Sequence, residues 1–371
     1  MMPDNFSQSD KQDQNTSRSQ PIWGIEYKLL ACERCKWVYL VKVEVNPQNC
    51  PACFHQTLVP ITNMEKYSNN YPPELVIPFS ASESLIIKNI ESFASGIPYA
   101  PEDLNYQALN QRLQRIYLPA WLVDGDIFAE WSAEAGFYYD ALSHLDHFDD
   151  NTGGWVSRQV TEKRIRWEPR LGRLRRKYQN IPGPALQESD VLLHQQLETF
   201  NTQKTQPYQA SILEEAIVRL PDRPQEDAWT DVQPAFQATA MEECRLACEA
   251  DQIRQFRWQP EYQNLNWTLL LLPLFSTFYQ DDDGQTQKVM IHGQTSQLTG
   301  QKRGSMKRAQ KASLNLLIAA GAIFIIGLIL TAIAVILPPL FALAGILLFV
   351  AILIGVGTVI PIWRVWVYNR N

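Results

Sequence analysis

Four cysteines near the N-terminus have the spacing of a metal-binding site. Cys32 and Cys35 are separated by two residues, and after a further fourteen residues Cys50 and Cys53 repeat that spacing. Each pair can form a tight turn, and the two pairs together offer four thiolates to one tetrahedral Zn²⁺ at about 2.3 Å per bond. Because four protein ligands close the coordination sphere, the pattern predicts structural zinc. The alternatives are four structural or redox thiols without a metal, or a site in which the adjacent His55 replaces one cysteine.

Two other groups of reactive side chains are weaker candidates. A second divalent cation is conceivable in a short acidic and histidine-rich window, for which the alternative is a polar loop between strands; its members are His144, Asp146, His147, Asp149 and Asp150. Cys244 and Cys248 lie four residues apart on one face of a predicted helix and are a conceivable redox or metal pair. Because they share an apolar stripe with Phe236 and Ala240, we favour buried reduced thiols.

A basic segment at 158–177 is opposed only by Glu162 and Glu168. Such a segment, with Trp155 and Trp167 nearby, suits a nucleic-acid backbone, anionic lipid headgroups or an acidic protein. We favour a solvated strand face, then lipid or protein contact, and nucleic acid last. The basic residues are Arg158, Lys163, Arg164, Arg166, Arg170, Arg173, Arg175, Arg176 and Lys177.

The overall charge argues against general nucleic-acid binding. Seven of the 33 basic residues and none of the 39 acidic residues lie after position 301, so residues 1–301 carry a net charge of −13. A surface this acidic repels phosphate backbones. The sequence also has no Gly-x4-Gly-Lys-Ser/Thr loop, no His-Glu-x2-His helix and no Ser/His/Asp order, so we expect no enzymatic activity.

The residues around the cysteines predict a zinc ribbon at 22–62. Strands are expected at 27–31, at 37–45 from the alternation of apolar and polar residues, and at 56–61. Such a small sheet has almost no hydrophobic core, so zinc would supply much of its folding free energy. Residues 1–21, rich in Ser, Gln, Asp and Asn, predict a disordered tail.

Residues 63–301 predict a soluble α+β body with mainly antiparallel strands and flanking helices. A capping box, Ser80-Ala81-Ser82-Glu83, starts one helix, and a second helix contains Leu109 and Leu113. Further helices are expected at 212–220 and after Pro234. Strands are expected at 116–124, 127–131, 136–140, 156–178 with interruptions at Pro169 and Gly172, 267–279 and 289–292, the last two joined by a turn at 281–284.

The C-terminal segment predicts a two-helix transmembrane hairpin. Residues 314–362 carry no charge, and 313–337 and 340–362 are each long enough to cross a hydrocarbon core of about 30 Å. Pro338-Pro339 breaks the helix between them. Basic residues gather in a juxtamembrane linker, 302–312, and Arg364 lies in a short tail, 363–371. The positive-inside rule therefore places the body and the C-terminus in the cytoplasm of an integral membrane protein, with the lipid bilayer as its first partner.

Several segments together resemble one family. They are the four-cysteine ribbon, residues 117–124 (Tyr-Leu-Pro-Ala-Trp-Leu-Val-Asp), residues 167–172 (Trp-Glu-Pro-Arg-Leu-Gly) and residues 292–300 (His-Gly-Gln-Thr-Ser-Gln-Leu-Thr-Gly) before the transmembrane C-terminus. The combination resembles poorly characterised bacterial membrane proteins with an N-terminal transcription-factor-IIB-type zinc ribbon. Members are often labelled replication-restart helicase-like from the ribbon alone, but this chain lacks the phosphate loop that a helicase motor needs. The resemblance implies an anchored zinc protein that acts through partners.

Two functions from different classes follow from these patterns. The favoured one is a non-catalytic scaffold or adaptor that binds a protein partner at the cytoplasmic membrane face. The alternative is a membrane-tethered nucleic-acid-binding protein that uses the ribbon and the basic segment 158–177.

Overall fold

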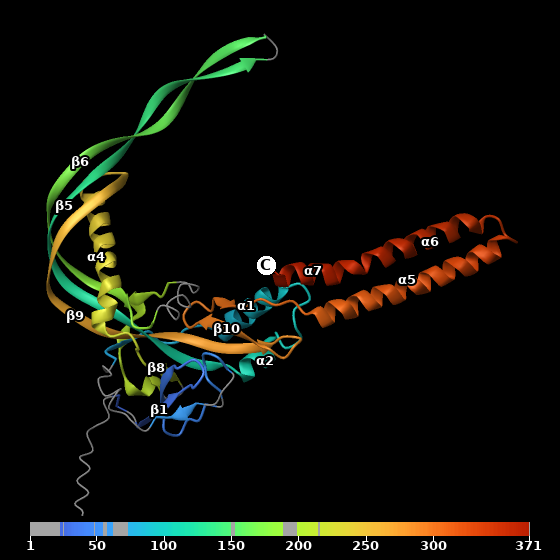
Figure 1. Ribbon diagram of the computed structural model, residues 1–371, viewed down its shortest axis with the longest axis horizontal. Helices are drawn as coiled ribbons and strands as arrows, with labels where there is room; N and C mark the ends of the chain where they lie inside the picture. Colours follow the sequence, from blue (N-terminus) through green and yellow to red (C-terminus); the bar gives the residue numbers. More distant parts are fainter. Residues whose placement is uncertain are drawn as a thin grey trace, which may run out of the picture.

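The computed structural model describes residues 23–24, 26–47, 49–54, 58–61, 73–149, 153–187, 199–213 and 216–370. The predicted tail at 1–21, His55 and Asp150 lie outside the described residues. The protein is mixed α/β with a mostly antiparallel sheet. Figure 1 shows a central body from which a long curved arm of strands and a hairpin of long helices extend.

One sheet runs through the body and into the arm. Its main path has the order β11-β10-β9-β5-β8-β2-β1-β3, with β4, β6 and β7 off this path. Its pairs are antiparallel except for β5 with β8 and β4 with β9. The strands are β1 Tyr27–Ala31, β2 Val38–Lys42, β3 Val59–Pro60, β4 Leu75–Val76, β5 Gln114–Asp149, β6 Gly154–Pro184, β7 Gln206–Pro207, β8 Ile217–Arg219, β9 Gln252–Gln280, β10 Thr286–His292 and β11 Leu298–Gly300.

The strands around the cysteines form one edge of this sheet. β1 pairs with both β2 and β3, and β2 also pairs with β8, where Leu40 lies opposite Val218. The third strand covers only Val59–Pro60 of the predicted 56–61, of which residues 56–57 lie outside the described residues. Trp37 and Tyr39 are buried in one cluster with residues of the body such as Leu118. The cysteine-bearing strands therefore share a core with the body.

The arm consists of the three longest strands. β5, β6 and β9 contain 36, 31 and 29 residues, and at about 3.4 Å per residue β5 is roughly 120 Å long. The separate strands predicted at 116–124, 127–131 and 136–140 are wrong, because all three are parts of β5. The strand predicted to start at 267 begins at Gln252. Register shifts at Val123/Gly125 and Ser132/Glu134 bend the strands without ending them.

β6 continues through the two residues that were predicted to interrupt it. In the described part of the chain, β6 pairs with β5 alone, so it is an edge strand. Pro169 is tolerated there because its missing N–H can face the open side. Gly172 lies opposite Trp131, and a Cβ at this glycine would lie 3.1 Å from the indole Nε1. The lack of a side chain at Gly172 leaves room for the Trp131 ring, and β6 continues through this residue.

Helix α4, Gln225–Ala247, covers the concave side of the arm near the body (Figure 1). Its buried Phe236 packs in one cluster with Ile127 of β5 and Tyr178 of β6. The helix begins directly after Pro224, so Pro234, which was predicted to start it, lies inside it. The start about two and a half turns earlier lets α4 cover more of the sheet.

The remaining elements of the body correct two predictions. They are α1 Glu83–Ser95, α2 Tyr106–Gln111, and the 3₁₀ turns η2 Thr202–Lys204 and η3 Ala210–Leu213. Ser82, not Ser80, caps α1, because its side chain accepts a hydrogen bond from the Leu85 amide. The helix predicted at 212–220 is wrong. After η3 the chain forms β8, whose Ile217 and Val218 pair with β5 and whose β-branched side chains suit a buried strand.

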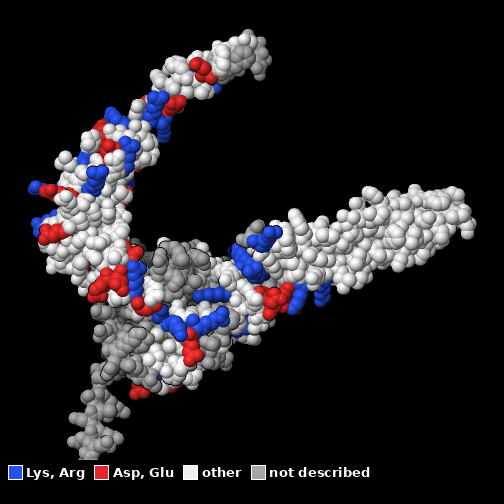
Figure 2. Space-filling model, viewed as in Figure 1, with Lys and Arg blue, Asp and Glu red and all other residues white. Residues whose placement is uncertain are grey.

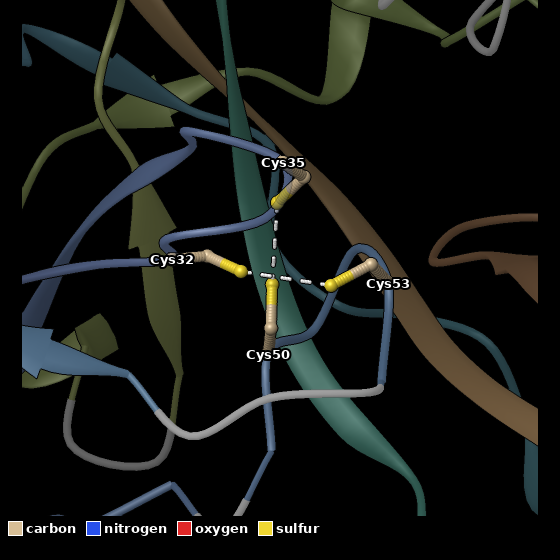
Figure 3. Close-up of side chains that lie close together, drawn as sticks. All are labelled: Cys32, Cys35, Cys50 and Cys53. Carbon is tan, nitrogen blue, oxygen red and sulfur yellow. Dashed lines mark hydrogen bonds between the residues drawn. The ribbon is translucent and has the colours of Figure 1, made fainter.

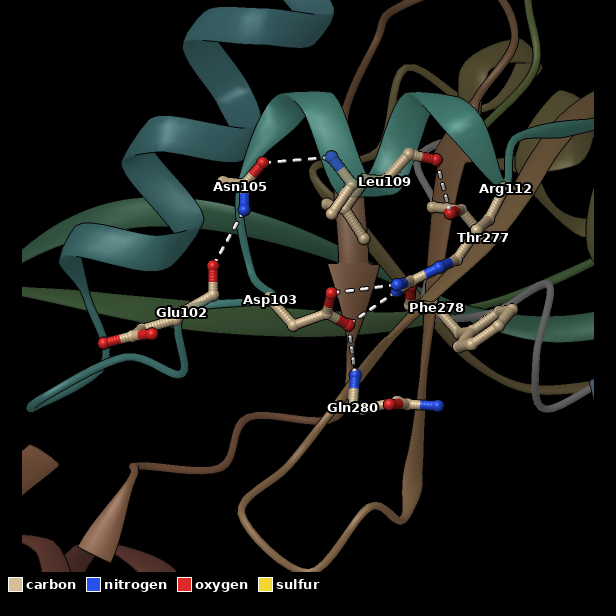
Figure 4. A network of polar contacts seen from close by, with 9 residues as sticks. Glu102, Asp103, Asn105, Leu109, Arg112, Thr277, Phe278 and Gln280 are labelled. Carbon is tan, nitrogen blue, oxygen red and sulfur yellow. Dashed lines mark hydrogen bonds and ion pairs between the residues drawn. The ribbon is translucent and has the colours of Figure 1, made fainter. Parts of the chain in front are cut away.

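A polar network fixes α2 to the end of β9 (Figure 4). The carboxylate of Asp103 accepts hydrogen bonds from the Arg112 guanidinium at 2.5 and 2.9 Å and from the Gln280 amide at 2.7 Å. Thr277 donates to the Leu109 carbonyl at 2.7 Å. Burial raises the pKa of Asp103, but the bonds and charge of Arg112 and the Gln280 amide outweigh burial and hold this pKa below 3.8. An ionised carboxylate therefore stabilises this corner.

The C-terminal helices are α5 Met306–Ala334, α6 Leu340–Gly357 and α7 Val359–Arg370. Two stretches, Met306–Ala334 and Leu340–Arg370, are long and apolar enough to cross a membrane, and most of their surface is uncovered by protein. Exposed apolar helices of this length support a membrane protein. Two details differ from expectation: the predicted linker 302–312 is helical from Met306 onward, and the predicted second span crosses the break between α6 and α7 at Thr358.

Both ends of the hairpin are fixed to the body by hydrogen bonds. Asp282, in the turn between β9 and β10, accepts from the Ser305 hydroxyl at 2.6 Å and from the Lys307 amide at 2.7 Å. It therefore supplements the cap that Ser305 provides for α5. Asn369 of α7 accepts from the Gly304 amide and donates to the Gly304 carbonyl. The hairpin thus has a set direction relative to the body.

Candidate metal centre

The four predicted ligands come together in space. Figure 3 shows the side chains of Cys32, Cys35, Cys50 and Cys53 pointing toward a common centre. The Sγ atoms of Cys32 and Cys53 are 3.6 Å apart, those of Cys35 and Cys50 are 3.5 Å apart, and all four lie within 4.8 Å of one another. Among the described residues, this is the group of Cys, His, Asp and Glu side chains placed to hold a metal ion. The prediction that these cysteines converge is confirmed.

These distances fit a tetrahedral metal ion better than a disulfide. Four sulfurs at about 2.3 Å from a central Zn²⁺ are separated by about 3.8 Å from one another, close to the spacing observed. A disulfide requires about 2.05 Å between sulfurs, and all four cysteines are free thiols. The cluster could therefore bind a metal ion with four sulfur ligands, leaving no open position for a substrate.

Each cysteine pair lies on a tight turn that ends in a left-handed residue. The Lys36 amide donates to the Cys32 carbonyl and the Phe54 amide donates to the Cys50 carbonyl, both at 2.9 Å. Lys36 has φ 63° and Phe54 has φ 57°. Glycine suits this conformation best, so both turns are held at a backbone cost of about 1–2 kcal/mol per residue. Lys36 and Phe54 each directly follow the second cysteine of a pair, so they occupy the same position in two similar turns and share one backbone conformation.

Hydrogen bonds within the cluster favour thiolate at Cys50. The hydrogen bond with Cys35 lowers the pKa of the Cys50 thiol and raises the pKa of Cys35. The Tyr39 hydroxyl lies 3.5 Å from the Cys50 sulfur. Burial raises the pKa of Tyr39 well above 10.0, so this hydroxyl stays protonated and can donate. The backbone amides of Ala52 and Cys53 also lower the pKa of Cys50, and such N–H···S bonds stabilise a metal-bound sulfur.

Sequence reasoning assigned Tyr39 only to a strand and missed its bond to sulfur. It also missed the contacts that hold the second turn to the body. Phe54 is 5% exposed, and its ring centroid lies 4.7 Å from that of Phe278 in β9. The Ser276 hydroxyl donates to the Pro51 carbonyl at 2.7 Å. The metal centre is therefore packed against β9.

The nine basic residues of 158–177 do not form one patch. All lie in β6, whose side chains alternate between its two faces. Tyr178 marks the face that packs against α4. The even-numbered Arg158, Arg164, Arg166, Arg170 and Arg176 share that face, and the odd-numbered Lys163, Arg173, Arg175 and Lys177 lie on the opposite face.

Acidic residues neutralise part of this basic charge. Glu168 forms ion pairs with both Arg166 and Arg170, and Glu130 of β5 pairs with Arg173. Figure 2 shows Lys and Arg mixed with Asp and Glu along the arm. The arm surface is therefore of mixed charge.

The two weaker candidate sites differ in how far the structure describes them. His144 and Asp146 lie in β5, and the side chains of His147 and Asp149 are outside the described part. Cys244 is buried in α4 and Cys248 follows as its C-cap. Burial raises the pKa of the Cys244 thiol to about 11, which makes it a poor nucleophile. Both are free thiols.

Figure 2 also shows that charge on the helical hairpin is confined to its base, while the rest of its visible surface is uncharged. No protein-family model, curated protein or solved structure matches the chain.

Proposed function

We propose that the protein is a membrane-anchored zinc-ribbon scaffold or adaptor that binds a protein partner at the cytoplasmic membrane face and catalyses no reaction. The arm carries this proposal. It extends far from the body, and its convex face is uncovered by other described elements. Leu171 lies on that face and is 85% exposed. A single exposed leucine is common on protein surfaces, so the proposal depends on the long uncovered face as a whole, and Leu171 serves as a probe position within it.

In this proposal a zinc ion bound by the four cysteines has a structural role. It holds the two turns at residues 32–36 and 50–54 next to the paired strands β1 and β2. Four thiolates around Zn²⁺ leave a net charge of −2; the buried Arg219 lies over the Trp37 ring, but its own charge is paired with Asp222. A closed sulfur site of this kind supports structure and binding, and lacks the open position of a catalytic zinc.

The hairpin anchors this unit in the proposed topology. Met306–Ala334 and Leu340–Arg370 would cross the bilayer with their connection at Pro338-Pro339 on the far side. Lys302, Arg303 and the other basic residues at the base would face the cytoplasm by the positive-inside rule. A protease added to intact cells should then leave the body uncut, and cleavage of the body without permeabilisation would overturn this orientation.

Nucleic-acid binding through the ribbon and the basic segment is the rival function. The division of the basic residues between two faces and their ion pairs with Glu130 and Glu168 weigh against it. A nucleic-acid binder should show affinity that falls steeply with rising salt, because phosphate contacts release counterions. Such salt-dependent binding of DNA or RNA by the purified protein would favour the rival.

The scaffold proposal is tested by crosslinking in intact cells. A photoreactive phenylalanine analogue at Leu171 should give an adduct with a defined protein, because this position faces the proposed partner. The same analogue at Ile325 in α5, 58% exposed, should give lipid adducts and no defined protein adduct. Repeated recovery of the uncrosslinked chain at Leu171 would contradict the proposal.

A further inference from the structure

The tip of the arm exposes large apolar side chains. Beyond Gly136, the last β5 residue paired with β9, the described residues of the arm belong to β5 and β6 alone. In this two-stranded tip, Leu142 is 70%, Leu145 56% and Trp155 74% exposed. A two-stranded ribbon in water is marginally stable because it has no core to bury such residues. Large apolar side chains that are exposed together in this way are suited to contact with a further surface.

These side chains point in opposite directions. Leu142 and Leu145 are an odd number of residues apart in β5, so they lie on opposite faces of the ribbon. Trp155 lies opposite Phe148, which places it on the Leu142 face. A folded protein docked on one face would leave the other exposed. A fluid lipid interface, in contrast, can surround both faces of an inserted hairpin.

The direction of the arm relative to the helical hairpin identifies which lipid surface is in reach. Figure 1 shows the arm leaving the body on the side away from α5 and α6, then bending over until its tip points in the same direction as these helices. The capping contacts of Asp282 and Asn369 fix the direction of the helices. A bilayer crossed by α5 and α6 would therefore face the arm tip.

We propose that the tip of the β5–β6 hairpin inserts into the headgroup layer of the same membrane that the helical hairpin spans, so that the protein contacts the bilayer at two separated points. This inference rests on the proposed membrane anchoring. Tryptophan prefers the membrane interface, and Trp155, the second residue of β6, is exposed near the tip.

Charged residues of the tip limit the depth of this contact. His144 and Asp146 are exposed in the same segment, and a carboxylate in the hydrocarbon core is costly. The contact is therefore interfacial. A second copy of the chain is the less suitable partner, because edge strands that carry basic residues such as Lys163 and Arg164 repel each other when they pair.

Lipid crosslinking tests this inference. The full-length protein is reconstituted into vesicles of phosphatidylcholine and phosphatidylglycerol with the photoreactive analogue at one of three positions. Trp155 tests the tip, Leu171 is an apolar control on the same strand that is even more exposed, and Ile325 tests the helical hairpin. We expect lipid adducts at Trp155 at least about fivefold more abundant than at Leu171, since only the tip would reside in the interface.

Three outcomes would overturn the inference. Adducts at Ile325 with no excess at Trp155 over Leu171 would refute the tip contact and leave the anchor intact. Crosslinks from Trp155 to a second copy of the chain would assign the tip to self-association. An absence of lipid adducts at Ile325 would refute the anchor, and with it the two-point contact.

Discussion

Replacing Lys36 or Phe54 by glycine should shift the stability of the metal centre in opposite directions. Both residues follow the second cysteine of a pair, and both have positive φ, at 63° and 57°. Glycine would relieve the same backbone strain at each position. The side chains differ, because Lys36 is exposed and Phe54 is buried against Phe278.

The magnitudes follow from this difference. A left-handed conformation costs a non-glycine residue about 1–2 kcal/mol, and the extra freedom of glycine in the unfolded chain cancels about 0.5–1 kcal/mol of the gain. Lys36→Gly should therefore stabilise the centre by about 0.5–1 kcal/mol. Phe54→Gly gains the same amount but loses a buried aromatic ring worth about 3–5 kcal/mol, for a net loss of about 3 kcal/mol.

Hydrogen exchange of the amides at 32–54 in the zinc-loaded, detergent-solubilised protein measures both effects. Since 1.4 kcal/mol is a factor of ten, exchange should slow about threefold in Lys36→Gly and accelerate more than about a hundredfold in Phe54→Gly. Glu33→Gly is the matched control, because Glu33 is exposed in the same turn without positive φ. If Lys36→Gly destabilised the centre as much as Glu33→Gly, the strain argument would be refuted.

Two further predictions concern the junction of body and hairpin. Asp282→Ala should weaken the start of α5 by about 1–2 kcal/mol, seen as roughly tenfold faster amide exchange at residues 306–309, whereas Asp283→Ala, an exposed neighbour, should leave exchange unchanged. Equal exchange in the two variants would contradict the capping role of Asp282. The depressed pKa of Asp103 contributes stability that is complete above its usual value of 3.8 and is lost as pH falls through the lower folded value. Asp103→Asn should therefore lose the acid-induced acceleration of amide exchange in α2, and an unchanged pH profile would show that another group causes it.

The four cysteines and the apolar helices could be found from sequence because their signals are local. The two-residue spacing within each cysteine pair fixes the turns, and the absence of charge over 314–362 fixes the hairpin. The positive φ of Lys36 and Phe54 was also foreseeable in part, since glycine is common at that position in such turns. The contacts around the cysteines could not be predicted from sequence, because Tyr39 reaches the Cys50 sulfur and Phe278 reaches the Phe54 ring only through tertiary packing.

The arm was predicted poorly because proline and glycine were interpreted as strand ends. Pro169 and Gly172 instead lie within β6, where the open edge permits the proline and the glycine leaves room for the Trp131 ring. Neither reason is visible without the neighbouring strand. The helix expected at 212–220 failed for a similar reason, since pairing of β8 with β5 and β2 overrides the local helical pattern.

The basic segment shows a signal that sequence did contain. Counting odd and even positions along a strand already separates Arg173 and Arg175 from Arg170 and Arg176. The ion pair with Glu130 depends on the register of β5 and β6 and required the structure. The contact of Asp282 with Ser305 likewise joins a turn to a helix start through a loop whose course the sequence does not specify.

The metal content of the purified full-length protein tests the central claim most directly. Elemental analysis should find one zinc per chain in the wild type, the same amount in Cys244→Ser, whose thiol lies in α4 away from the cluster, and almost none in Cys50→Ser. A folded wild-type chain without zinc, or a Cys50→Ser variant that retains it, would contradict the assignment of this cluster as a zinc centre.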